Sequence, residues 1–354
     1  MTVKTPILGV LEGFYGRPWA PATRLLMMQW LPGLGYDAYL YAPKADAHLR
    51  KAWRQPWPPA ERQHLRELGQ SCALTGLSYQ VGLSPFELYR SYNRTARAAL
   101  KSKLGEIEDL GVSGLAILFD DMPGNVESLA ARQAEICADI QHWIGGEGMA
   151  LRVCPSYYSD DPVLDEIFGQ RPDGYLSTLC DDLHQCYEIF WTGPAVCSDT
   201  LNGADLKNVS KECRGKLAIW DNYPVNDSRA RSPHIYVGDL SGRSADISAL
   251  ISSHWCNAMN QPALSLPALA SLPQLYRPLS EQALQTRVDV FNEAGISREL
   301  INACTPLAGL RRDELSKVAM RELKSVARID SVAALELRDW LAGGYEFDPQ
   351  CLTN

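Results

Sequence analysis

The chain has 354 residues, of which 46% are hydrophobic, so it can bury a core large enough for one barrel-sized domain with a small appendage. Its formal net charge is -8 at pH 7 and its basic residues form no block, which argues against a protein that binds nucleic acid through phosphates. The N-terminal apolar core is too short for a signal peptide and no later run approaches the roughly 18 to 20 apolar residues of a membrane span, so we predict a cytoplasmic protein.

Short apolar runs that end in polar or glycine-rich turns recur along the first three quarters of the chain and predict eight β-strands. The runs cover residues 7–13, 36–43, 77–85, 114–121, 150–158, 188–194, 216–224 and 247–257. Amphipathic stretches between them, such as 61–75, 93–110 and 126–144, predict helices. This alternation is typical of a parallel sheet covered by helices, and eight units over about 260 residues predict a closed (β/α)8 TIM barrel. A doubly wound open sheet is the alternative, but no G-x-G-x-x-G motif follows the first strand.

The sequence changes character after the eighth predicted strand. Consecutive helices are expected there, with N-cap candidates at Ser280, Ser297 and Asp330. We therefore predict a catalytic barrel over residues 1–267 and a C-terminal helical region over residues 268–354. Packing against the barrel is the expected role of that region.

Reactive and hydrogen-bonding residues gather at the ends of the predicted strands. In a parallel barrel these ends form the active face. The residues in question are Glu12, Gly13, Lys44, Asp46, Asp120, Asp121, Tyr157, Tyr158, Asn222, Asp227 and Asn257. They are far apart in sequence, and a closed barrel would bring them to one mouth.

The pair Asp120 and Asp121 directly follows the apolar run 115–119. Two adjacent buried carboxylates cannot both ionise easily, so we expect the pKa of one to rise from about 3.9 toward the range of a general acid. A solvated turn, a helix N-cap or a Mg²⁺ site would also use such a pair. No third acidic ligand lies at an obvious spacing, and the position at a strand end favours an active site.

Residues 219–227 combine aromatic, amide and carboxylate side chains. Asn222 and Asp227 can hydrogen-bond sugar hydroxyls, and Trp220 and Tyr223 offer flat faces on which sugar C–H groups stack. A turn stabilised by asparagine hydrogen bonds is the alternative. Lys44 is ambiguous in the same way, since it is either a surface lysine or a donor to a hydroxyl at the barrel mouth.

Ten cysteines are distributed over the chain without CxxC pairs. This pattern indicates neither a zinc site nor a disulfide framework, and buried free thiols are the expected state of several of them. We expect neither a metal nor a cofactor.

Five segments together carry a resemblance to a known family, and they lie in order and at barrel-strand spacing. The segments are EGFYGRPW, YAPKAD, ILFDD, FWTGP and IWDNYPVND. They resemble glycoside hydrolase family 84, the O-GlcNAcases and related β-N-acetylglucosaminidases, over roughly residues 7–265. The resemblance implies a (β/α)8 catalytic barrel that removes terminal β-linked N-acetylglucosamine from a glycoprotein or oligosaccharide with retention. The nucleophile implied is the substrate's own acetamide oxygen, which forms an oxazoline intermediate.

The resemblance also implies roles for the residues at the strand ends. Asp120 would accept a hydrogen bond from the acetamide N–H, and Asp121 would serve as general acid and then as general base. The residues implied to bind the sugar hydroxyls are Gly13 through its backbone, Lys44, Asp227 and Asn257. Those implied around the acetamide are Asn222, Tyr158 and Trp220.

The chain departs from the family pattern at three strand ends. YAPKADAHLR lacks the second acidic residue, and the proline after the lysine, that relatives commonly have. CPSYY lacks the glutamate that commonly precedes the tyrosine, and CNAMNQ stands where Asn-Pro is usual, which leaves Asn260 as an alternative to Asn257. The differences affect the rim and therefore bear on substrate preference before catalysis.

Two other functions stay open at this point. One is a catalytically weak N-acetylglucosamine-binding relative that keeps the pocket. The other is a conventional two-carboxylate glycosidase, with Glu12 or another carboxylate as nucleophile. The presence of both Asp120 and Asp121 favours an active enzyme that uses substrate assistance.

Overall fold

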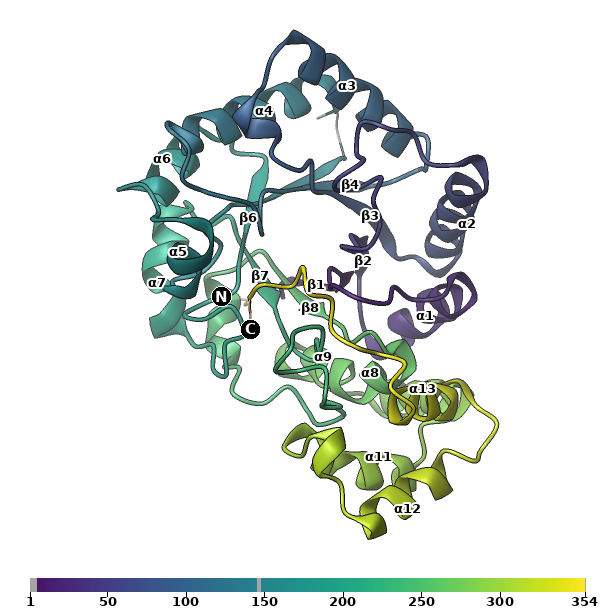
Figure 1. Cartoon of the computed structure of the whole chain (residues 1–354). Helices are drawn as coiled ribbons and strands as arrows, with labels where there is room; N and C mark the ends of the chain where they lie inside the picture. Colours follow the sequence, from purple (N-terminus) through teal and green to yellow (C-terminus); the bar gives the residue numbers. More distant parts are fainter. Residues whose placement is uncertain (1–4, 145–147, 354) are drawn as a thin grey trace.

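Eight parallel strands form a closed barrel in the computed structural model, which describes residues 5–144 and 148–353. The strands follow one another around the ring, and the last pairs with the first (Figure 1). They are β1 (Ile7–Glu12), β2 (Ala38–Tyr41), β3 (Ser78–Leu83), β4 (Gly114–Leu118), β5 (Ala150–Cys154), β6 (Tyr187–Trp191), β7 (Leu217–Asp221) and β8 (Ser253–Asn257). The predicted (β/α)8 barrel is confirmed. Every predicted strand is present, although β6 begins one residue before its predicted range.

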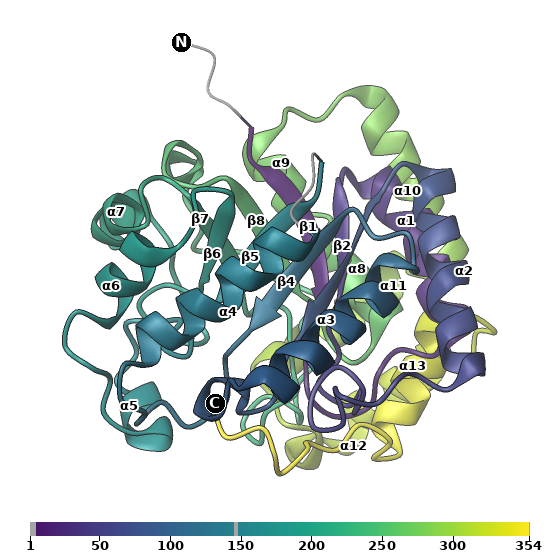
Figure 2. The ribbon, with the colours of Figure 1, turned by 90° about the horizontal axis from the view of Figure 1, so that it is seen from above.

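Helices surround the strands in both views of the molecule (Figures 1 and 2). Those of the repeating units are α1 (Pro21–Leu34), α2 (Pro59–Thr75), α3 (Arg94–Glu108), α4 (Leu129–Ile144), α5 (Val163–Phe168), α6 (Tyr175–Asp182), α7 (Gly203–Glu212) and α8 (Pro262–Leu269). α1 and α2 begin at a proline, whose fixed φ suits the first helical turn. They end at Gly35 and Gly76, which adopt the left-handed conformation with φ of 96° and 77°.

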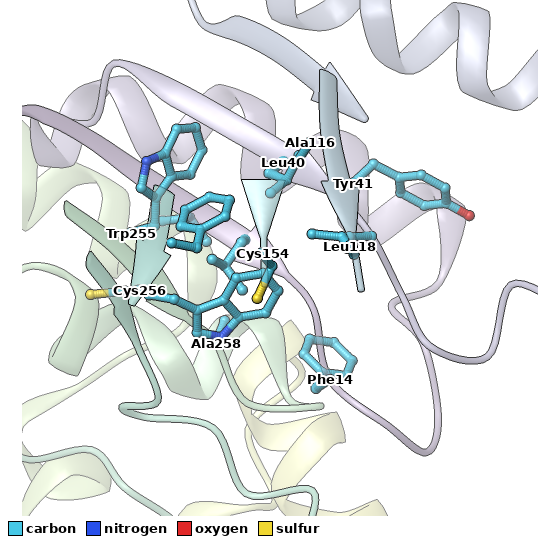
Figure 3. Packing of buried hydrophobic residues seen from close by; sticks show 14 of the residues in the cluster. Phe14, Leu40, Tyr41, Ala116, Leu118, Cys154, Trp255, Cys256 and Ala258 are labelled. Carbon is cyan, nitrogen blue, oxygen red and sulfur yellow. The ribbon is translucent and has the colours of Figure 1, made fainter. Parts of the chain in front are cut away.

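The barrel interior is filled by side chains from alternate positions of the strands. Trp255 lies against Gly9, where an added Cβ would be 2.1 Å from the indole. Arg152 lies over the same indole and pairs with Glu188 at 2.7 Å, so its buried charge is compensated inside the barrel. Figure 3 shows part of this packing, with labelled side chains that include Leu40, Leu118, Cys154 and Trp255.

The chain continues beyond the barrel in a further set of helices. These are α9 (Leu272–Tyr276), α10 (Glu281–Ala294), α11 (Arg298–Cys304), α12 (Lys317–Val326) and α13 (Val332–Leu341). Two short 3₁₀ turns, η3 (Thr305–Ala308) and η4 (Arg312–Glu314), lie between α11 and α12. Two others lie within the barrel units: η1 (Leu88–Arg90) and η2 (Ala245–Ala249). Ser280 and Ser297 cap α10 and α11 as predicted. The predicted cap at Asp330 is wrong, because the hydroxyl of the next residue, Ser331, accepts the backbone N–H of Ala334.

The C-terminal helices pack on the outside of the barrel. α10 lies against α1, and α13 lies against α8. The predicted boundary at residue 267 falls inside α8, and the division of the chain into two domains stays a prediction. No helix among the described residues is long and apolar enough to cross a membrane.

Glu336 of α13 connects the C-terminal helices to the barrel. Its buried carboxylate accepts the backbone N–H groups of Ala263 (3.1 Å) and Leu264 (3.0 Å) at the start of α8. Burial raises the pKa of Glu336 to about 8, and the two N–H groups oppose that shift without cancelling it. Between about pH 4.5 and pH 8, the folded chain therefore retains a proton on Glu336 that the unfolded chain releases.

Because of this proton, we expect the stability of the protein to depend on pH, and we expect a weaker dependence in Glu336→Gln. Because the folded pKa lies above the ordinary value of 4.5, the contribution of Glu336 is fully present below pH 4.5 and decreases as the pH rises toward about 8. The decrease should amount to several kcal/mol at most, since one pKa unit corresponds to about 1.4 kcal/mol. Urea unfolding of both proteins from pH 5 to pH 9 measures it. The same slope in the two proteins would contradict the assignment.

Candidate active site

A cavity at the C-terminal ends of the strands brings most of the predicted residues together. Its lining includes Gly13, Lys44, Asp120, Asp121, Tyr158, Trp220, Asn222, Asp227 and Asn257. These residues lie at or after the ends of six different strands, and the closure of the barrel places them around one space. Glu12, Asp46 and Tyr157, which were expected at the same mouth, are not among the residues that line it.

Asp120 and Asp121 both reach this cavity because the backbone turns sharply after β4. In an extended strand, neighbouring side chains point to opposite faces. Asp121 instead has a φ of 55°, in the left-handed region that non-glycine residues seldom adopt. The turn presents the second carboxylate beside the first, and backbone strain of this kind is concentrated at functional sites.

Lys44 and two tyrosines surround the acid pair. The Lys44 ammonium contacts Oδ2 of Asp120 and lies 3.3 Å from Oδ2 of Asp121. Asp121 also accepts the hydroxyls of Tyr15 at 3.0 Å and Tyr158 at 3.1 Å. The buried Oδ1 of Asp120, in contrast, has no hydrogen-bond partner among the residues described. A ligand that carries an N–H group would find its acceptor there.

The two carboxyl groups are shifted in opposite directions. Burial, reinforced by the charge of Asp121, raises the pKa of Asp120 despite the nearby Lys44. Burial also acts to raise the pKa of Asp121, but Lys44, Arg50 and the two tyrosine hydroxyls outweigh it, so this pKa is lowered. The expectation that one pKa of the pair rises is confirmed for Asp120. Asp121, to which the family resemblance assigns the acid role, is the more acidic group in this structure.

Lys44 is held differently from the prediction made for it. The sequence suggested a donor to a sugar hydroxyl, whereas its ammonium contacts both carboxylates. Burial favours the neutral amine, but the charges of Asp120 and Asp121 outweigh it and raise the pKa of Lys44. The lysine is therefore charged and neutralises part of the acid pair.

Asn257, Asn222 and Trp220 form a connected polar wall opposite the acid pair. Asn257 accepts the N–H of Gly13 at 3.2 Å and donates to Oδ1 of Asn222 at 2.9 Å. The same Oδ1 accepts the indole N–H of Trp220 at 3.0 Å, which fixes the orientation of both amides. A Cβ at Gly13 would lie 2.5 Å from the Trp220 ring. Contact with the Trp220 ring therefore already requires glycine at position 13. The approach of a ligand is a second possible reason.

The loop after β1 is held by Asp227 and Asn260. Asp227 accepts the N–H of Tyr15 at 2.8 Å, and Asn260 donates to the carbonyls of Tyr15 and Arg17 at 2.9 Å each. Asn260 fixes the loop from outside the cavity, whereas Asn257 lines the cavity, so the structure favours Asn257 as the ligand-facing amide. Burial raises the pKa of Asp227 to about 6, with Tyr15 opposing the shift and the charge of Asp121 adding to it.

Glu12 has a structural role. The sequence analysis had left it open as a possible nucleophile. It is fully buried and accepts two 2.7 Å bonds from Arg24, a 2.6 Å bond from the Tyr39 hydroxyl and a 3.1 Å bond from the N–H of Trp19. It is not among the residues that line the cavity. A two-carboxylate mechanism with Glu12 as nucleophile is therefore inconsistent with this structure.

Several residues of the site were missed by the sequence analysis. Arg50 donates to the backbone carbonyl of Asp121 at 3.0 Å, and Cys351 and Thr353 line the cavity from the opposite end of the chain. The sequence around Arg50 is rich in lysine and arginine and is typical of a surface turn. Residues 345–353 show no pattern that would indicate a site. Within the described ranges, no three His, Cys, Asp or Glu side chains gather in a way that could hold a metal ion.

The chain has clear similarity to known proteins. Residues 8–294 match the family described as beta-N-acetylglucosaminidase. The protein O-GlcNAcases of Rattus norvegicus and Mus musculus are 30% identical over 249 residues, which is 68% of this chain and 26% of each relative. The chain thus spans about a quarter of the length of these relatives. A mutant of the O-GlcNAc hydrolase of Thermobaculum terrenum shares the fold with a TM-score of 0.75 at 25% identity, over 95% of this chain and 80% of that one.

Proposed function

Because this chain belongs to the β-N-acetylglucosaminidase family, glycoside hydrolase family 84, we propose that it is a retaining exo-β-N-acetylglucosaminidase. The family prediction made from the five sequence segments is confirmed. The observation that carries the proposed activity is the single cavity that holds both adjacent aspartates together with Tyr158, Asn222 and Asn257. The relatives are named protein O-GlcNAcases, and we propose protein-bound N-acetylglucosamine as the substrate, with oligosaccharide ends as the alternative. A cytoplasmic location stays a prediction.

The first step of the proposed reaction uses the free oxygen of Asp120. Its Oδ1 would accept the acetamide N–H, while the Lys44 ammonium contacts the other oxygen of the same carboxylate. The acetamide oxygen then attacks the anomeric carbon, and the bond from that carbon to the leaving oxygen breaks. Positive charge develops on the acetamide as the oxazoline forms, and the adjacent carboxylate stabilises it.

The proton balance of the reaction is assigned to Asp121. It would donate a proton to the leaving oxygen and then take a proton from the water that opens the oxazoline at the anomeric carbon. Retention follows, because the two attacks take place on opposite faces of the sugar. No cofactor enters either step.

Tyr158 offers a way to protonate Asp121, whose pKa is lowered in the structure. Each hydrogen bond to the ionised carboxylate lowers its pKa, and Tyr158 supplies one of them at 3.1 Å. If this hydroxyl turns from Asp121 to the acetamide oxygen of a bound sugar, Asp121 loses a donor and its pKa rises. Substrate binding would in this way prepare the acid.

A sugar-binding relative with weak catalysis is the second candidate function. The ionised state of Asp121 favours it, since a general acid has to be protonated before the leaving group departs. Such a protein would bind N-acetylglucosamine in the same cavity and release almost no product. Hydrolysis therefore distinguishes the two candidates.

The full chain should release the aryl group from a chromogenic β-N-acetylglucosaminide, and the first sugar product should be the β-anomer. Proton NMR during the first minutes of the reaction measures the anomer before mutarotation. Asp120→Asn serves as the matched control, because it preserves the shape of the side chain and removes the carboxylate that accepts the acetamide N–H, whatever the leaving group. Release no faster than with this control would favour the binding protein, and a first product in the α-form would contradict a retaining mechanism.

A further inference from the structure

Residues 345–353 cross the mouth of the barrel. The chain leaves α13 and returns over the ends of the strands to the centre of the ring, where it is drawn in yellow near β1 and β7 (Figure 1). In Figure 2 the same segment runs along the end of the barrel toward which β4 points. Cys351 and Thr353 line the cavity together with Asp120 and Asp121.

The segment limits the space at the mouth of the barrel. The cavity has a volume of about 40 Å³, and Cys351 and Thr353 form part of its wall. We expect a pyranose ring with an acetamide arm to enter the cavity only if the segment moves.

The inner end of the segment lies against the groups that are proposed to bind the sugar. The buried Thr353 side chain lines the same cavity as Tyr158, the residue assigned to the acetamide. The half-buried Cys351 lies close enough to Asp227 and Asp121 for their charges, added to burial, to raise the pKa of its thiol. Two side chains of the segment therefore lie beside the residues that the proposed function assigns to the sugar.

Few contacts hold the segment to the barrel. Arg17 lies over the Tyr345 ring at 5.0 Å, and Arg229 lies over the Phe347 ring at 4.6 Å. The Lys51 ammonium donates to Oε1 of Gln350. Near the inner end, the N–H of Cys351 donates to the carbonyl of Asp348 within the segment itself, at 2.9 Å. Several side chains between these points are exposed: Glu346, Pro349, Gln350 and Leu352. A segment with so few buried contacts can open at low cost.

We propose that residues 346–353 are an internal plug that occupies the sugar site in the resting protein and leaves it when substrate binds. The inference rests on the proposed function, since it identifies the cavity with the sugar site. The alternative is a fixed wall, in which Cys351 and Thr353 stay in place and contact the bound sugar. The two arrangements predict opposite changes in the accessibility of Cys351.

Alkylation of Cys351 tests the plug in the unmodified full chain. The protein is treated with iodoacetamide with and without saturating N-acetylglucosamine, whose binding is measured separately by calorimetry, and modification is followed by peptide mass spectrometry. The exposed Cys186 serves as the internal reference. The sugar should raise the relative rate at Cys351 several-fold because the segment leaves the cavity. A lower or unchanged rate in the sugar-bound protein would overturn the plug.

A full-length variant tests the plug independently of catalysis. Cys351→Gly combined with Thr353→Gly removes the two side chains that line the cavity, and Leu352→Gly, which changes the exposed residue between them, is the matched control. Without any sugar, alkylation of Cys197 in the cavity wall should be faster in the double variant than in the control. Equal rates would contradict the plug even if the protein had no hydrolase activity.

The same pair of variants gives a kinetic result if the chain hydrolyses an N-acetylglucosaminide. The double variant should show a KM about tenfold lower with kcat little changed, the value expected if the plugged state is about ten times as populated as the open one. Leu352→Gly should keep the original KM. A KM that rises in the double variant would contradict the plug and indicate a wall that contacts the sugar. Absence of hydrolysis in all three proteins would refute the proposed function. The alkylation of Cys197 would then still test the plug.

Discussion

Hydrolysis of an N-acetylglucosaminide with a poor leaving group, such as a simple alcohol, should fall by about 10²- to 10⁴-fold in Asp121→Asn, the range of a positioned general acid. The loss should be much smaller with a dinitrophenyl leaving group, which departs with little protonation. The reason lies in the site, where Asp121 is the carboxylate that Tyr15 and Tyr158 orient into the cavity. The dependence on the leaving group isolates the proton-donating role from any loss of binding.

The measurement is kcat/KM over a series of aryl and alkyl N-acetylglucosaminides. This quantity covers the steps up to release of the first product, so the separate role of Asp121 in activating water does not affect it. Asp120→Asn is the matched control, because loss of the acetamide acceptor should slow every member of the series by a similar factor. A loss in Asp121→Asn that is independent of the leaving group would refute the acid assignment.

The sequence was sufficient for the barrel because its pattern is repeated eight times. Each strand is a short apolar run, and residues at or after the ends of several strands line the cavity. The closure of the ring converts these ends into one site, so Asn257 and Gly13, which are far apart in the chain, form a hydrogen bond of 3.2 Å. Local periodicity therefore located the fold and most of the predicted residues that line the cavity.

The features that the sequence did not indicate depend on the direction of side chains and on contacts between distant segments. Glu12 and Gly13 are neighbours at the end of β1, yet the strand turns one into the outer layer against Arg24 and the other into the cavity. No composition rule distinguishes them. The same holds for Lys44, whose contacts with the acid pair depend on the left-handed turn at Asp121.

The segment that enters the cavity was beyond prediction for a further reason. Residues 345–353 have no periodic pattern, and a chain that follows a helical region is expected to lie on the surface. Its path over the mouth depends on α13, which Glu336 fixes to the start of α8. The contacts of Glu336 with α8 thus help to place the segment next to Asp120 and Asp121.

A β-glucoside with the same leaving group as a good N-acetylglucosaminide substrate should be hydrolysed at least about 10⁵-fold more slowly, because it lacks the internal nucleophile, and well-placed intramolecular groups have effective molarities of 10⁵ to 10⁸ M. The two substrates differ only at the second carbon, so protonation of the leaving group is the same in both. Comparison of kcat/KM for the pair measures the contribution of the acetamide. A trifluoroacetamido analogue, whose carbonyl oxygen is a weaker nucleophile, should lie between the two.

Equal rates on the glucoside and the N-acetylglucosaminide would require a nucleophile from the protein. Glu12 is engaged by Arg24 and Tyr39 outside the cavity, and Asp120 and Asp121 lie side by side next to Lys44. The remaining carboxylate in the cavity wall is Asp227. In that case Asp227→Ala should abolish hydrolysis of both substrates, whereas under substrate assistance it should mainly raise KM, since Asp227 then binds sugar hydroxyls and takes no part in bond formation.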